Sequence, residues 1–232
     1  MKETAMTSAT SPRRARTPLS RATLVASATE LADSEGLQAV TIRQLAHRHG
    51  VTAMAIYAHF DDKEALLDAL GEALLDSVQV PDLTAGDSRT NLGAVLTAFV
   101  EALRAHPAIA PITARRILEC DSGIDLAEQL LAQLTALGHP SGLAAATSHY
   151  LLSGVVALVA SEPGRSCIPH DIEGQEQLIR SRRARLLALA PERHPHVVAA
   201  ATPLTMCANP DIYYAQGIEL LVNGACALGH SR

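Results

Sequence analysis

A group of side chains between residues 41 and 63 combines hydrogen-bond donors with small and apolar groups. The Arg43 guanidinium can donate to a guanine edge, while alanine and methionine side chains can contact thymine methyl groups. The Tyr57 hydroxyl, the Lys63 ammonium and the amides at a helix start suit phosphate oxygens. This is the chemistry of double-stranded DNA recognition. The residues that we expect to face DNA are Thr41, Arg43, Thr52, Ala53, Met54, Tyr57, Ala58, His59 and Lys63.

Short helices on either side of a glycine would bring these side chains to one surface. Gly50 separates two short segments, and Thr41 with Gln44 has the form of a capping box. Two short helices joined by a tight turn and braced by a third form the arrangement that inserts one helix into the major groove. His59 has a second interpretation as a partly buried core histidine. We expect helices from Ser20 to Glu35, from Thr41 to Gly50, from Thr52 to about His59, and from Asp61 or Asp62 to Val78.

The landmarks of residues 20–68 share one register, and they are Thr41, Leu45, Ala46, Gly50, Val51, Ile56, Tyr57, His59, Phe60, Lys63, Glu64, Leu66 and Leu67. With these landmarks the segment resembles the TetR family of bacterial transcriptional regulators. The resemblance implies an all-α homodimer with an N-terminal DNA-binding domain and a C-terminal domain. In that family a small-molecule effector bound by the C-terminal domain relieves repression.

Three stretches of the remaining chain resemble the tetracycline repressor subgroup: LLDALGEALLDSV, AFVEALRAHP and YYAQGIELLVNG. In an ungapped comparison after His106, the metal-binding histidine of tetracycline binders falls on Thr113. This departure argues against tetracycline itself as the effector. We predict neither a metal nor a cofactor, since His194 and His196 form too short a cluster for a metal site.

The composition indicates packed helices rather than a sheet. The chain is 48% hydrophobic but only 3% aromatic, with no tryptophan, so leucine, alanine and valine must fill its core. We expect three regions: a disordered basic arm (1–18), a helix-turn-helix domain (19–68), and an effector-binding and dimerisation domain (69–232). The further helices that we expect are 91–105, 108–119, 123–137, 142–161, 173–190 and 210–228, with a break from Pro191 to Pro210.

The distribution of charge also favours a DNA-binding end. The whole chain has a net charge of −5, but residues 1–60 hold seven Lys and Arg against four acids. The remaining residues hold twelve basic and twenty acidic side chains. A basic N-terminal part on an acidic body suits a protein that contacts DNA at one end.

The last predicted helix has the spacing of a helix-pair seam. Its apolar positions follow intervals of four, three, four and three. One alternative is that this seam packs only within its own subunit. The uncharged helix 142–161 also needs cover, so we predict a four-helix dimer interface rather than membrane insertion. The seam residues are Tyr214, Ile218, Leu221 and Ala225, followed by Leu228.

The C-terminal helices offer few polar groups for a ligand, which favours a mostly apolar effector. Arg115 and Glu119 could instead pair with neighbours, and His149 could be a buried, hydrogen-bonded histidine. The cluster from Arg180 to Arg185 fits a solvated helix face better than an anion site. The candidate ligand contacts are His106, Arg115, Glu119 and His149.

Other classes of protein lack their signals. There is no GxSxG, GxGxxG, P-loop or HExxH motif, so we predict no enzyme. An architectural DNA binder without an effector is a further alternative. The N-terminus has no apolar signal-peptide core, and the four scattered cysteines suggest neither disulfides nor zinc. We therefore expect a cytoplasmic protein whose partners are a palindromic operator, a small-molecule effector and a second copy of itself.

Overall fold

A computed structural model describes residues 19–84, 86–164 and 172–229. These residues form twelve α-helices and one 3-10 helix, and no strand occurs among them. The expected all-α fold is confirmed. The expected arm at residues 1–18 lies outside the described residues.

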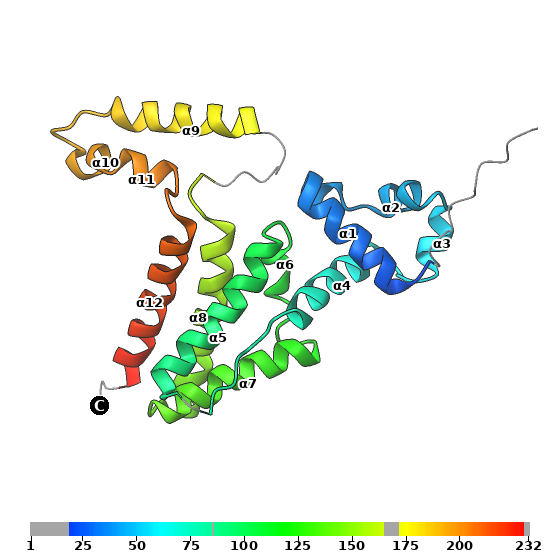
Figure 1. Cartoon of the computed structure of the whole chain (residues 1–232), viewed down its shortest axis with the longest axis horizontal. Coiled ribbons are helices and arrows are strands. Elements are labelled where there is room, and N and C mark those ends of the chain that lie inside the picture. The colour runs from blue at the N-terminus through cyan, green and yellow to red at the C-terminus, as the bar shows by residue number, and fades with distance from the viewer. Residues whose placement is uncertain (1–18, 85, 165–171, 230–232) are drawn as a thin grey trace, which may run out of the picture.

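Four helices and a 3-10 turn make up the N-terminal part of the chain (Figure 1). Leu24, Leu45, Ile56, Phe60 and Leu66 are buried between them. A small core of this kind holds the short helices in place, since α-helices of five to eight residues are marginal alone. The elements are α1 (Arg21–Glu35), η1 (Leu37–Ala39), α2 (Ile42–His49), α3 (Ala53–Tyr57) and α4 (Lys63–Asp76).

Local capping residues set where these helices begin and end. The Ser20 hydroxyl accepts a hydrogen bond from the Thr23 amide, and the Asp62 carboxylate accepts one from the Ala65 amide at 2.8 Å. Gly50 ends α2 with a left-handed backbone (φ 62°), a conformation that glycine adopts without strain. Thr52 stands at the start of α3, but its hydroxyl makes no hydrogen bond to the first turn of that helix.

The C-terminal part is built around α5, whose inner face is closely packed. Leu92, Val95, Phe99 and Leu103 are all fully buried there. Helices α7, α8 and α12 pack against α5, and α6 lies between α4 and α8. These elements are α5 (Ser88–Ala105), α6 (Ala110–Thr113), α7 (Asp121–Ala136), α8 (Ser141–Ala160) and α12 (Pro210–Gly229).

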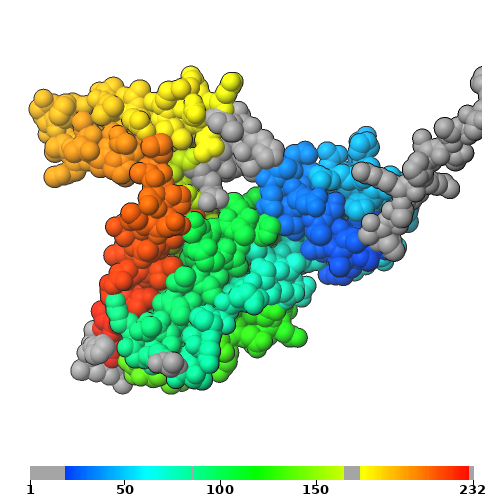
Figure 2. Space-filling model, viewed as in Figure 1, coloured from blue at the N-terminus to red at the C-terminus, as the bar shows by residue number. Residues whose placement is uncertain are grey.

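Helices α9 (Ile172–Leu187), α10 (Pro195–Ala199) and α11 (Ala201–Thr205) form a separate layer. They pack mainly on one another, and Figure 2 shows this layer at one end of the body, beyond α12. The Arg182 and Arg185 side chains are exposed on α9, which agrees with a solvated helix face.

Two expected segments differ from the structure. The expected helix 108–119 is only the four-residue α6, followed by turns whose amides bond to the carbonyl three residues earlier, as from Arg116 to Thr113. The expected break from Pro191 to Pro210 contains α10 and α11. Pro195 is the first residue of α10, a position where a proline has no helical hydrogen bond to lose.

Among the described residues, α8 has the length and composition to cross a membrane. Its Leu151, Leu152, Val155 and Val159 side chains are nevertheless buried within this chain. Apolar residues on this side of α8 therefore serve the core of the C-terminal part.

Candidate DNA-binding surface and effector domain

Helices α2 and α3 meet across the Gly50 turn as a helix-turn-helix. Ile42, Leu45 and Ile56 point into the core, as the sequence predicts. On α3 the Met54 side chain is 74% exposed and that of Tyr57 is 43% exposed. An exposed large apolar side chain on a short helix suits contact with a groove floor rather than with water.

The remaining predicted DNA contacts differ in how free their side chains are. Arg43, Thr52, Ala53 and Ala58 are exposed, whereas Lys63 and His59 are half-buried. The Thr41 hydroxyl is already used, because it accepts a hydrogen bond from the Gln44 amide at 3.1 Å. Thr41 thus holds the start of α2, and the exposed side chains form the surface that DNA could approach.

Arg21 is a positioning residue that the sequence patterns did not single out. Its guanidinium donates to the His59 carbonyl at 3.3 Å and lies 4.7 Å from the centre of the Phe60 ring. These contacts tie the start of α1 to the segment directly after α3. The signal in the sequence was a basic residue directly after a capping serine, but its partners are 38 and 39 positions away.

Ionic contacts join the DNA-binding helices to the C-terminal part. His106, directly after α5, lies 2.7 Å from the Asp33 carboxylate on α1. Arg115 pairs with Glu64 at 2.8 Å and with Asp68 at 2.9 Å on α4. The hydrogen bond to Glu64, with the charges of both acids, raises the pKa of Arg115 above its ordinary value.

The four candidate ligand residues are not gathered around one cavity. His106 and Arg115 make the contacts just described, and Glu119 pairs with Arg116. His149 is exposed on α8, where its ring packs edge-on against Tyr150. The interpretation of His149 as a buried, hydrogen-bonded histidine is therefore wrong, because that face of α8 points away from the core.

A buried hydroxyl on α8 has the properties expected of a ligand contact. Thr147 is 3% exposed, and its Oγ1 has no hydrogen-bond partner among the described residues. Buried polar atoms are normally paired, so this oxygen is free to bond a water molecule or a ligand. The sequence signal was a polar Thr-Ser pair in a helix that is otherwise apolar.

The predicted seam on α12 faces this chain's own core. Tyr214 and Ala225 are buried, and Arg104 of α5 lies 4.7 Å from the centre of the Tyr214 ring. The Leu221 side chain would lie 2.9 Å from a β-carbon on Gly154 of α8. Tyr214 and Ala225 thus pack within this chain, and Leu221 and Ile218 are half-buried in the same packing, while a dimer contact through this seam stays a prediction.

A second apolar face of α12 is uncovered. Leu220 is 73% exposed, and a β-carbon on Gly224 would meet no atom within 4 Å. On α8 the Tyr150 side chain is 69% exposed, near the exposed His149. The spacing of apolar residues along α12 could not show which of its two apolar faces is buried, because both faces follow helical spacing.

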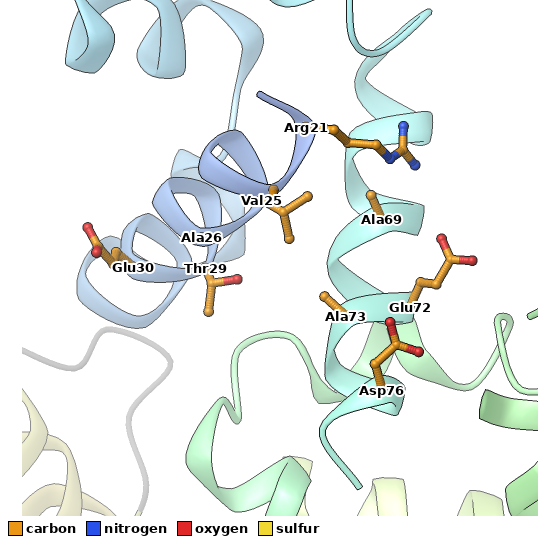
Figure 3. A pocket seen from close by; sticks show the side chains of 10 residues that line it. Arg21, Val25, Ala26, Thr29, Glu30, Ala69, Glu72, Ala73 and Asp76 are labelled. Carbon is orange, nitrogen blue, oxygen red and sulfur yellow. The ribbon is translucent and has the colours of Figure 1, made fainter. Parts of the chain in front are cut away.

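The described residues contain no group of three or more His, Cys, Asp or Glu side chains that could hold a metal ion. One hollow of about 720 Å³ lies between α1 and α4 (Figure 3). None of the four candidate ligand residues lines it.

Comparison with known proteins follows the same division of the chain. The profile of "Bacterial regulatory proteins, tetR family" matches residues 24–70, and that of "Tetracyclin repressor-like, C-terminal domain" matches residues 80–228. The tetracycline repressor protein class C of Escherichia coli is 25% identical over 222 residues, covering 89% of this chain and 90% of that protein.

Two solved structures have the same fold. Streptomyces coelicolor ActR in complex with actinorhodin has a TM-score of 0.73 at 24% identity, covering 93% of this chain and all of that one. BioQ with its double-stranded DNA operator has a TM-score of 0.60 at 22% identity, covering 90% of this chain and 99% of that one.

Proposed function

Because this chain belongs to the TetR family of DNA-binding transcriptional regulators, we propose that it is a repressor released from a palindromic operator by a small, mostly apolar effector. The observation that carries the DNA-binding part is the helix-turn-helix whose α3 exposes Met54 and Tyr57 while burying Ile56. Residues 19–68 would form the DNA-binding domain and residues 69–232 the effector and dimerisation domain. A protein that acts on bacterial DNA works in the cytoplasm.

If the protein is a homodimer, we expect its operator to be palindromic, because the two subunits are related by a twofold axis. The exposed faces of α8 and α12, with Tyr150, Leu220 and Gly224, can form a four-helix interface about a twofold axis. Two recognition helices related by that axis would address half-sites about one helical turn apart. This proposed interface differs from the seam first predicted through Tyr214 and Leu221, which is the alternative that a test must distinguish from it.

The DNA surface is tested by selecting binding sequences from random duplexes. We expect an inverted repeat, and Arg43→Ala should weaken binding to it by about 1–3 kcal/mol while relaxing the preference at one position. Arg185→Ala, which removes an equally exposed charge from α9, is the control and should bind as the parent does. Equal loss in both variants would mean that only net charge matters and that Arg43 does not read the groove.

The effector site is proposed in the C-terminal domain, with the Thr147 hydroxyl as an orienting group. ActR, which shares the fold, was solved in complex with actinorhodin, and this supports a small-molecule ligand for a protein of this fold. His106, Arg115, Glu119 and His149 remain candidates, although the first three already contact other polar side chains. The unpaired Thr147 oxygen is the better supported contact.

Thr147→Val tests that role because valine has nearly the same shape. In the effector-free protein the substitution removes an unpaired buried hydroxyl, so the free energy of unfolding should rise by about 1 kcal/mol. Compounds that displace the protein from its operator should act more weakly on this variant. Ser153→Ala, at an exposed position of α8, should change neither property. A loss of stability in Thr147→Val would show that the hydroxyl is paired.

The packing of α5 favours a second candidate, an architectural DNA binder without an effector. Leu92, Val95, Phe99 and Leu103 are fully buried on its inner face. An effector would then have to separate helices that are closely packed. If no compound in a broad panel of apolar molecules weakens operator binding, the architectural function replaces the repressor.

A further inference from the structure

The hollow between α1 and α4 has the size of a small-molecule site. Its volume is about 720 Å³, and sites for such ligands span about 300–1,000 Å³. Figure 3 shows its two walls, α1 on one side and α4 on the other. It lies beside the DNA-binding helices, at the boundary between the two proposed domains, and neither Thr147 nor any of the four candidate ligand residues lines it.

Small side chains create this hollow. Ala22 and Ala26 lie one turn apart on α1, and Ala69 and Ala73 lie one turn apart on α4. Val25 completes the apolar lining beside them. Alanines at facing positions leave the two helices unfilled where larger side chains would interdigitate. The floor is therefore suited to the apolar part of a ligand.

Carboxylates dominate the charge around the hollow. Glu30, Glu72 and Asp76 line it together with a single cation, Arg21. Arg21 is occupied by Phe60 and the His59 carbonyl. Two negative charges therefore remain in excess.

The three carboxylates around the hollow differ in their hydrogen-bond and ion-pair partners. Glu30 pairs with Arg48 at 3.2 Å, and Asp76 accepts a hydrogen bond from Ser122. Among the ion pairs of the described residues, none includes Glu72. Figure 3 shows Glu72 and Asp76 projecting from the same side of α4. An unpaired carboxylate with a second one a turn away attracts a cation.

We propose that the hollow between α1 and α4, the α1–α4 groove, binds a small cationic amphiphile. Its apolar body lies against the alanines and Val25, and its cationic head lies by Glu72 and Asp76. Such a ligand favours one spacing of α1 and α4, so it changes operator affinity to the extent that the DNA-bound form has another spacing. The ligand site does not depend on the proposed repressor function.

Calorimetric titration of the full-length protein tests the site without DNA. The probes are octyltrimethylammonium, octyl glucoside and octyl sulfate, which share one alkyl chain and differ in charge. We expect saturable binding of one octyltrimethylammonium per chain, and at least tenfold weaker binding of the other two. Equal affinity for all three would overturn the proposal, because it would mean that only the alkyl chain is bound.

Two variants assign the binding to the groove. Glu72→Gln should weaken octyltrimethylammonium about fivefold and leave octyl glucoside unchanged. Ala73→Leu fills the hollow from an exposed position and should weaken all binding more than tenfold, whereas Ala184→Leu on α9 should have no effect. Unchanged binding in both groove variants would refute the site. A change of sedimentation coefficient in Ala73→Leu would also refute it, because the groove would then be a contact between two copies.

Discussion

Two adjacent leucines on α12 provide a sharp test of the dimer interface. Leu220 is 73% exposed, while Leu221 packs against Gly154 within its own chain. Burying a whole leucine side chain is worth about 2 kcal/mol. Twofold symmetry places two copies in the interface, so Leu220→Ala should weaken association by about 2–3 kcal/mol, or about 30–150-fold in the dimer dissociation constant.

Sedimentation equilibrium over a range of protein concentrations measures this change directly. Leu221→Ala is the matched control, since it removes the same atoms one position away. It leaves a cavity between α8 and α12, so it should lower the free energy of unfolding by about 1–3 kcal/mol with little effect on association. Operator affinity should fall with Leu220→Ala, because one subunit can engage only one half-site.

A second substitution separates an effect on the dimer contact from an effect on the stability of the single chain. A β-carbon at Gly224 would meet nothing within 4 Å in the single chain, and the position is exposed, so Gly224→Leu should fold as well as the parent. In the proposed dimer it would hold the helices apart and produce monomers. If Leu221→Ala dissociates the dimer while Leu220→Ala and Gly224→Leu do not, the interface uses the seam first predicted from the sequence, and the structural reasoning is wrong.

Three further expectations concern charge. Lys63→Ala should weaken binding to all DNA sequences alike and reduce the slope of log affinity against log salt by about one, measured by fluorescence anisotropy, whereas an unchanged slope would mean that Lys63 contacts no phosphate. Asp33→Asn weakens the half-exposed contact with His106 and should lower the free energy of unfolding by about 0.5–1 kcal/mol, and His106→Gln should add little to it in the double variant. Asp87 caps α5, and its hydrogen bonds from Thr90 hold its pKa below the ordinary 3.8, so its stabilising effect is present above that pH and is lost as the pH falls below it. The free energy of unfolding, measured as the pH is lowered, should therefore include a loss from Asp87 in the parent that is missing in Asp87→Asn.

The N-terminal helices could be predicted from the sequence because local residues determine them. Ser20, Thr41 and Asp62 each accept an amide hydrogen bond three residues later, and Gly50 supplies the left-handed turn. Contacts over such short distances leave a pattern in the sequence. The surface of α3 follows from them, since a fixed start and a buried Ile56 determine which side chains face outward.

The partners of the candidate ligand residues could not be predicted in this way. His106 contacts a carboxylate 73 positions away, and Arg115 contacts one 51 positions away. No periodicity relates such pairs. The same limit applies to α12, where both Tyr214 and Leu220 lie on apolar faces and only the position of α5 and α8 decides which face is covered.

The contacts between the two parts of the chain limit how an effector could act on DNA binding. The pairs of Arg115 with Glu64 and Asp68 are largely exposed, and exposed ion pairs contribute about 0–1 kcal/mol each. Allosteric coupling is typically about 1–3 kcal/mol, so these pairs alone supply at most its lower part. The remainder must come from apolar packing, and α4 is the element that provides it, because it carries buried leucines and packs against α1, α6 and α7. A shift of α4 would carry Lys63 and the end of α3 with it, since only five residues separate α3 from α4.

The coupling between effector and DNA binding should therefore be more sensitive to Leu70→Ala, in the buried face of α4, than to the loss of Arg115. An equal effect of the two substitutions would show that the ion pairs carry the coupling.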